Sequence, residues 1–330
     1  MRVIAIILGL SALPIVTSAH HSLTEYDRSV QQEIEGEVLR VMWSNPHIRL
    51  TLRRENEDGE EEIWDIHGFD LNSLDRRSIP RNLVRVGDLI RVSGSPSNRR
   101  EHHLYASNLL VASGTEIMIN PAAEPLWSET VVGRPASAPS TSVTVTEGQS
   151  IFRVWSRAPG VADTRRFPFT AAAIATRTAW NPEDNFAIQC EPEGMPRIMT
   201  NPHPFQFVDE GARIALRSEL YDLTRTIHLD DAAIPAGELA SPLGHSVGRW
   251  EGNTLVVSTT RVNWPYFDNI GTRQSEVAEY TEQFTLGEDQ NRLDYRLIIT
   301  DPATFSEPAI YERYWLALGE DLQRYDCQVY

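Results

Sequence analysis

The sequence contains no lysine, and all 30 of its basic residues are arginine. A Schiff-base or pyridoxal-phosphate mechanism requires a lysine amine, and a Walker P-loop requires a lysine on the phosphates, so these classes are excluded. The 46 acidic residues outnumber the 30 arginines, so the net charge is −16. Nucleic-acid-binding proteins concentrate positive charge to displace counterions from phosphates, so we expect no nucleic-acid partner.

Long apolar runs are absent after the first residues of the chain. At the start, Arg2 precedes a short apolar stretch and then the small residues Thr17, Ser18 and Ala19. This pattern is typical of a secretory signal peptide over residues 1–19, and its apolar core is too short to span a bilayer as a stable helix. We therefore expect a periplasmic or secreted protein, with no stable membrane insertion after cleavage.

Cysteine is rare as well, since Cys190 and Cys327 are the only two in the sequence. In an oxidising compartment such a pair is more often bridged than free. We therefore predict a disulfide that ties the last residues of the chain to the start of the C-terminal domain. The alternative is a thiol nucleophile, which export disfavours because exposed thiols oxidise there.

Residues 30–112 alternate polar and apolar side chains with a period of two, which is typical of half-buried strands. Three such strands precede a helix-compatible stretch at residues 70–84, and two more follow it. This is the order of an OB-fold, a five-stranded barrel with a helix between its third and fourth strands. We predict an OB-like domain over residues 20–118, with Gly36 allowing the first strand to coil sharply.

The rest of the chain divides into a linker and a second domain. Residues 119–149 are rich in Pro, Ala, Ser and Thr, with too little apolar surface to offset the entropy of ordering, so we predict a linker. Residues 150–330 begin with a helix-like stretch and continue as six to eight short strand patterns separated by turn residues. Such strands must close to hide their edges, so we predict a lipocalin-like antiparallel β-barrel that can hold a small ligand. The expected fold class is all-β with minor α.

Residues 244–248 spell GHSVG, which matches the GxSxG pattern that holds a nucleophilic serine in lipases and esterases. That serine lies on a strained turn between a buried parallel strand and a helix. Here a Pro- and Ala-rich loop precedes Ser246, and the hairpin-turn residues Glu251, Gly252 and Asn253 follow it. We therefore predict that Ser246 is a strand residue and not a nucleophile.

Several motifs are similar to those of exported bacterial proteins without an established activity. AHHSLTEYD, GEVLRVMWSNPH and VGDLIRVSGSP resemble a family of small exported domains of unknown function (the 6152 type). CEPEGMPRIM, SVGRWEGNTLVVSTT and ITDPATF resemble a second set of secreted proteins of unknown function. The resemblance implies export and a two-domain architecture, but no reaction.

Histidines at the expected mature amino terminus are candidate metal ligands. Cleavage of the signal peptide makes His20 the first residue, with His21 beside it. A terminal amine and imidazoles suit copper, nickel or zinc, and His47 in an Asn-Pro turn can add a ligand. Copper is the candidate cofactor, although the sequence firmly implies none, since loose histidine pairs bind metals weakly without a fixed second shell. His102 and His103 are interpreted as solvated loop residues.

A second candidate site lies in the segment SELYDLTRTIHLDD. Strand alternation places His228 and Asp230 on one face and Arg225 on the other. A histidine beside a carboxylate can form an acid/base pair, as in a cofactor-free isomerase or hydrolase. The candidate catalytic residues are His228, Asp230, Glu219 and His245.

The alternative places the apolar face of this strand, with Ile227, inside the barrel and the His/Asp pair in water. Arg225 is then an interior charge that needs a partner, either Glu219 or an anionic ligand. Trp250 and Trp155 either close the core or line a pocket. The leading hypothesis is a binding protein for a small, partly apolar or anionic molecule held near Arg225, Trp250 and Trp155.

Overall fold

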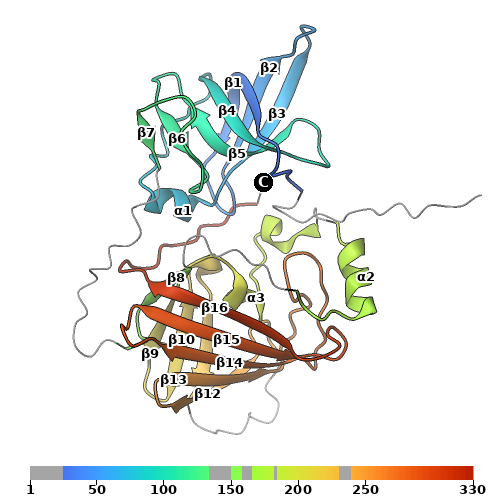
Figure 1. Ribbon diagram of the computed structural model, residues 1–330, viewed down its shortest axis with the longest axis vertical. Coiled ribbons are helices and arrows are strands. Elements are labelled where there is room, and N and C mark those ends of the chain that lie inside the picture. The colour runs from blue at the N-terminus through green and yellow to red at the C-terminus, as the bar shows by residue number, and fades with distance from the viewer. Residues whose placement is uncertain (1–24, 134–149, 158–165, 182–183, 230–238, 330) are drawn as a thin grey trace, which may run out of the picture.

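Two β-barrels make up most of the protein (Figure 1). The computed structural model describes residues 25–133, 150–157, 166–181, 184–229 and 239–329. The predicted signal peptide, His20, His21, Asp230 and residues 134–149 of the predicted linker lie outside the described residues. In the described part of the chain, no helix has both the length and the apolar character needed to cross a membrane.

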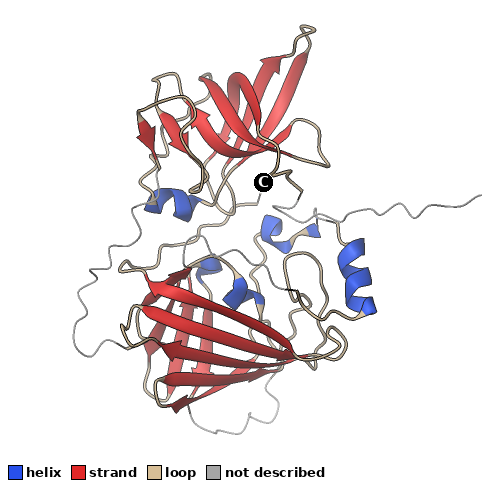
Figure 2. Ribbon diagram, viewed as in Figure 1, coloured by secondary structure: helices blue, strands red, loops and turns tan. Residues whose placement is uncertain are grey.

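The first barrel has five strands, with one helix between the third and the fourth (Figure 2). The elements are β1 (Gln32–Met42), β2 (Arg49–Glu55), β3 (Glu61–His67), α1 (Leu71–Arg76), β4 (Leu89–Pro96) and β5 (His103–Leu110). A parallel pairing of β3 with β5 closes the order β1-β2-β3-β5-β4, which confirms the predicted OB-like barrel. Alternate residues such as Leu50, Ile66 and Leu104 face the common core.

The first strand coils around this barrel, as the glycine in it suggests. A Cβ atom on Gly36 would lie 2.6 Å from the backbone oxygen of Arg53 on β2, so only glycine fits there. The register between the two strands shifts between Val38 and Arg40. This irregularity lets β1 pair with β2 at one end and with β4 at the other.

Helix α1 is shorter than the pattern over residues 70–84 suggests. Asp70 caps it by accepting a hydrogen bond of 2.8 Å from the backbone N–H of Ser73. Beyond its last turn, Ser78 has a positive φ of 55°, and Pro80 cannot continue a helix. The remaining residues therefore form turns that lead into β4.

The first part of the predicted linker is structured. Strands β6 (Glu116–Met118) and β7 (Val131–Val132) extend the sheet beyond β5. The buried carboxylate of Glu116 accepts hydrogen bonds of 2.8–3.0 Å from the backbone N–H groups of residues 126–128. One buried carboxylate thus holds a loop whose composition alone indicates an unstructured segment, and residues 119–133 pack on the first barrel.

The second barrel is closed by nine strands, where six to eight were expected. Its order is β10-β11-β12-β13-β14-β15-β16-β8-β9. The strands are β8 (Val154–Arg157), β9 (Phe205–Asp209), β10 (Arg213–Ser218), β11 (Thr224–His228), β12 (His245–Glu251), β13 (Thr254–Thr260), β14 (Glu279–Leu286), β15 (Arg292–Thr300) and β16 (Ala309–Ala317). Neighbours pair antiparallel as predicted, except that β11 and β12, which residues 229–244 separate in sequence, pair in parallel.

Helical segments lie outside the sheet of the second barrel. Among the described residues they include α2 (Ala171–Ala179), α3 (Arg197–Thr200) and the 3₁₀ turns Phe186–Gln189 and Leu220–Asp222. Aromatic side chains fill the barrel interior, with ring centroids of Phe205 and Trp315 4.7 Å apart and those of Tyr295 and Trp315 4.8 Å apart. The interior is therefore a packed aromatic core.

The C-terminal segment runs between the two barrels (Figure 1). The predicted disulfide between Cys190 and Cys327 is confirmed, with Cα atoms 5.8 Å apart. Beside it, the backbone N–H of Gln328 donates to the backbone oxygen of Asn45 at 3.0 Å. The disulfide therefore anchors the C-terminal segment to the second domain, and the same segment also contacts the first domain.

Candidate functional site

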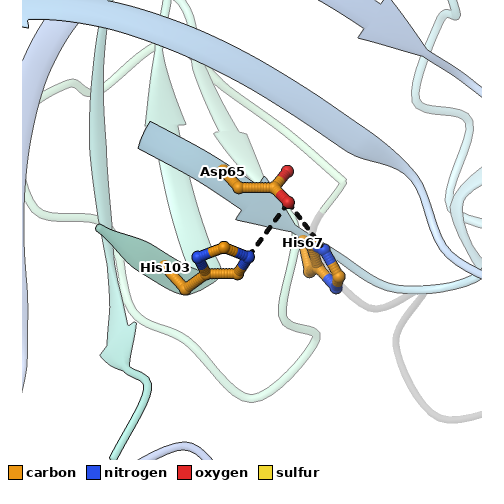
Figure 3. Close-up of side chains that lie close together, drawn as sticks. All are labelled: Asp65, His67 and His103. Atoms are coloured by element: carbon orange, nitrogen blue, oxygen red, sulfur yellow. Dashed lines mark ion pairs between the residues drawn. The ribbon is translucent and has the colours of Figure 1, made fainter. Parts of the chain in front are cut away.

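One cluster of potential metal ligands stands out among the described residues: Asp65, His67 and His103 (Figure 3). Asp65 and His67 lie on β3, and His103 is the first residue of β5. The parallel pairing that closes the barrel sets Asp65 opposite His103. Ile66, between Asp65 and His67, and Leu104, next to His103, face the core. The side chains of Asp65, His67 and His103 therefore share the outer face of the barrel, where β3 and β5 pair to close it.

The geometry of the cluster suits a small cation. Asp65 Oδ2 lies 3.1 Å from His103 Nε2 and 3.5 Å from His67 Nε2. A tetrahedral ion with ligand distances of about 2.05 Å places its ligand atoms about 3.3 Å apart, and the two separations bracket this value. His67 Nε2 is buried and, among the described residues, makes no hydrogen bond. A buried ring nitrogen that points at a carboxylate without a hydrogen bond is suited to a ligand.

Arg49 on β2 completes the surroundings of the carboxylate. Its Nε donates to Asp65 Oδ1 at 2.6 Å, and its Nη2 donates to Asp65 Oδ2. In the antiparallel register of β2 and β3, Arg49 stands directly opposite His67. Three adjacent strands, β2, β3 and β5, therefore contribute to one site.

The protonation states also suit metal binding. Burial alone would raise the pKa of Asp65, but its interactions with His103, His67 and Arg49 outweigh burial and hold this pKa well below its usual range. Burial lowers the pKa of the His67 imidazole, and Asp65 opposes this only in part. An ionised carboxylate and a neutral imidazole are the forms that bind metals.

Two tyrosines and the first described residues of the chain cover part of the site. The Tyr26 ring lies 6.5 Å from the His67 ring and 5.3 Å from the Tyr105 ring, measured between centroids. Burial raises the pKa of both hydroxyls far above neutral pH, so both are protonated. The side chains of Asp65, His67 and His103 are 12–20% exposed, so the site is enclosed but reaches solvent.

His47, predicted as a metal ligand, lies beside this site but outside the cluster. Its Nδ1 donates to the backbone oxygen of Gly68 at 3.1 Å. Burial, together with the nearby His67, lowers its pKa to about 4. His103, expected in a solvated loop, instead begins a strand and belongs to the cluster, whereas the neighbouring His102 side chain is 41% exposed.

Ser246 of the GxSxG pattern lies on β12, between a turn and a hairpin, as predicted. It is buried, and its hydroxyl accepts a hydrogen bond of 3.0 Å from Arg225 Nε. The hydroxyls of Ser246 and Thr259 are 2.9 Å apart. No helix follows this strand within the described residues, so the nucleophile elbow is absent there.

Arg225 points into the second barrel, as strand alternation predicts, but its partner differs from the expected one. Its Nη1 donates to Glu282 Oε1 at 3.0 Å, and Tyr295 donates to the same oxygen at 2.9 Å. Glu219 instead binds Arg76 of the first barrel. Glu282 lies on β14 and faces Arg225 across the interior of the second barrel. Glu219 directly follows β10, where it contacts the first barrel.

The two tryptophans occupy different environments. Trp155 is fully buried in the core of the second barrel, where its Nε1 donates to the backbone oxygen of Ile151 at 2.8 Å. Trp250 is 42% exposed near the end of β12 and contacts Phe152 edge to face. Trp155 therefore belongs to the core, whereas Trp250 lies at the surface, and a role for either ring in ligand binding stays a prediction.

His228 and His245 lie side by side, with parallel rings 5.1 Å apart. His228 ends β11 on the face opposite Ile227, which is fully buried, and this agrees with the alternation predicted for the strand. Asp230, the expected partner of His228, lies outside the described residues. A catalytic role for these residues stays a prediction.

The cluster of Asp65, His67 and His103 was not predicted from the sequence. The signal for two of its members is the spacing Asp-x-His, which places both side chains on one face of a strand. His103 joins them only because β3 and β5 pair to close the barrel. These two strands are separated in sequence by α1 and β4.

Comparison with known proteins supports the assignment of the first domain. Residues 9–104 match the model of a family described as a family of unknown function (DUF6152). The match confirms the resemblance inferred for the N-terminal domain, and its range contains Arg49, Asp65, His67 and His103. No curated protein matches the chain.

Proposed function

We propose that the first barrel binds a divalent transition-metal ion through His67, His103 and Asp65. The observation that carries the proposal is the approach of two imidazole nitrogens to one carboxylate oxygen at 3.1 and 3.5 Å. Two nitrogens and one oxygen suit Cu²⁺, Zn²⁺, Ni²⁺ or Co²⁺, and three protein ligands leave a position open for water or a further ligand.

The position of the cluster in the fold supports a binding role. OB-folds bind their ligands on the face of the second and third strands and in the loops between strands one and two and between strands four and five. Arg49 and Asp65 lie on β2 and β3, and residues 43–48 and 97–102 form the corresponding loops. His47 belongs to the first of these loops.

The predicted ligands at the mature amino terminus are close in sequence to a residue that packs against the cluster. His21 precedes Tyr26 by five residues, so even a fully extended chain spans no more than about 18 Å between them. Tyr26 itself packs against His67. We propose that His20, with its terminal amine, and His21 add nitrogen ligands, which favours copper among the candidate metals.

We propose that the protein performs this role after export. The disulfide between Cys190 and Cys327 is typical of an oxidising compartment. The amino-terminal pattern of a signal peptide supports the same location, and its cleavage would produce the terminal His20.

Ligand binding in the second barrel has less support. Arg225 was expected to need a partner, and Glu282 supplies one inside the barrel. Aromatic side chains occupy the interior around this pair. A small apolar or anionic ligand near Arg225, Trp250 and Trp155 therefore stays a prediction from the sequence.

Titration of the mature, metal-free chain with Co²⁺ or Cu²⁺ tests the proposal, with visible absorption and calorimetry as readouts. His103→Ala should weaken binding by more than about tenfold, because loss of even an outer-shell partner of a metal costs that much. His102→Ala is the matched control, since this neighbour is exposed and outside the cluster. Equal binding by the two variants would refute the site.

A further inference from the structure

Asp65 Oδ2 faces three nitrogen atoms at once. His103 and His67 approach it from β5 and β3, and Arg49 Nη2 approaches it from β2. Among the contacts described for Asp65, both imidazoles approach Oδ2, and only Arg49 approaches Oδ1. A metal ion held by the two imidazoles must therefore bind the oxygen that Arg49 already occupies.

We propose that Arg49 is a positioning residue that competes with the metal for Asp65 and so keeps the ion exchangeable. This inference rests on the proposed function. To bind, the ion displaces Nη2 of Arg49 from Oδ2, while Nε can keep its 2.6 Å hydrogen bond to Oδ1 and hold the carboxylate plane in place. The guanidinium is permanently charged and stays within a few ångströms of the dication, and this repulsion weakens binding further.

A purely structural role for the pair is the alternative. The Arg49 side chain is 33% exposed, and ion pairs with that much access to water contribute little to stability. Its removal should therefore leave the fold intact. The same removal leaves Asp65 with a full negative charge directed at the two imidazoles, which is a better site for a dication.

The cluster drawn in Figure 3 thus has two states. Without metal, Arg49 is the cation that pairs with Asp65. With metal, the ion takes over that role at Oδ2. Because both partners bind the same oxygen, metal binding must displace the Arg49 contact, and this lowers the net affinity, which suits a protein that releases its ion to an acceptor.

The test compares Arg49→Gln with Arg53→Gln in the full mature chain. Arg53 lies four residues along on the same strand, and its ion pair with Glu37 is likewise exposed. Competition with a chromophoric chelator gives the Zn²⁺ affinity, and stopped-flow transfer to excess chelator gives the release rate. We expect Arg49→Gln to bind Zn²⁺ about tenfold more tightly, in line with removal of a neighbouring like charge, and to release it correspondingly more slowly. Arg53→Gln should match the unaltered protein.

Arg49→Lys serves as a second variant, because it retains the charge but loses the two-pronged contact. Its affinity should lie between those of the unaltered protein and Arg49→Gln. If the unaltered protein binds Zn²⁺ and Arg49→Gln binds it equally or more weakly, the competition does not exist, although the metal site stands. If neither protein binds Zn²⁺ or Cu²⁺, the proposed function fails as well.

Discussion

Arg76 and Glu219 form an ion pair across the junction of the two barrels, with Arg76 Nη1 2.6 Å from Glu219 Oε1. The Glu219 side chain is fully buried, and it also accepts a hydrogen bond of 2.9 Å from the backbone N–H of Gln323 in the C-terminal segment. One carboxylate thus joins the helix of the first barrel, the second barrel and the segment between them.

Glu219→Gln should destabilise the junction, because it leaves the largely buried guanidinium of Arg76 without its main counter-charge. Breaking a buried pair in this way costs roughly 3–5 kcal/mol, and we expect the lower end because Glu320 lies 3.6 Å from Arg76. Urea unfolding measures the loss. Arg81→Gln, which breaks an exposed pair with Asp75, is the control and should change stability by less than about 1 kcal/mol.

The buried pair of Arg225 and Glu282 permits a second prediction. Glu282→Gln should cost roughly 3–5 kcal/mol, since it leaves Arg225 as an unpaired charge in the core of the second barrel. The double variant Arg225→Met, Glu282→Leu should cost clearly less than the sum of the single variants Arg225→Met and Glu282→Leu, because it removes both charges together. Chemical denaturation of the four proteins gives the coupling. Additive effects would show that the two side chains do not act as a pair.

Ser246→Ala should affect stability and leave the structure of the site in the first barrel unchanged. The substitution removes the hydroxyl that accepts from Arg225 and contacts Thr259, and loss of one such buried partner costs about 1–3 kcal/mol. Ester hydrolysis measured on both proteins provides the decisive comparison. A serine-dependent esterase activity that this substitution abolishes would contradict the assignment of Ser246 as a structural residue.

Local patterns predicted much of the fold, whereas the candidate site depends on contacts between distant residues. The period-two alternation predicts the five strands of the first barrel and the inward direction of Arg225. The partner of Arg225, however, stands 57 residues away across the interior of the barrel. His103 meets Asp65 only after the barrel closes, and composition cannot reveal that Glu116 holds the following loop.

Reduction of the disulfide should destabilise the protein and loosen the C-terminal segment from both domains. The bridge joins residues 137 apart in sequence, and closing a loop of that size contributes about 2–5 kcal/mol. Thermal unfolding with and without a phosphine reductant measures the change, and the variant Cys190→Ser, Cys327→Ser should not respond to the reductant. Equal stability of the oxidised and reduced protein would contradict a structural role for the bridge.

Stability should also fall on mild acidification, because His47 is held neutral in the folded protein. Burial lowers its pKa to about 4, below the value near 6.5 that applies to an unfolded chain. Between these two values the unfolded state binds the additional proton, so the contribution is complete above pH 6.5 and is lost as the pH falls towards 4. The expected loss is on the order of 2 kcal/mol. Urea unfolding of metal-free protein at pH 7.5 and pH 4.5 measures it. His47→Gln should reduce the difference, although His67 and His203, whose pKa burial also lowers, still contribute, and His102→Gln, at an exposed position, should leave it unchanged. An undiminished pH dependence in His47→Gln would assign the effect to other groups.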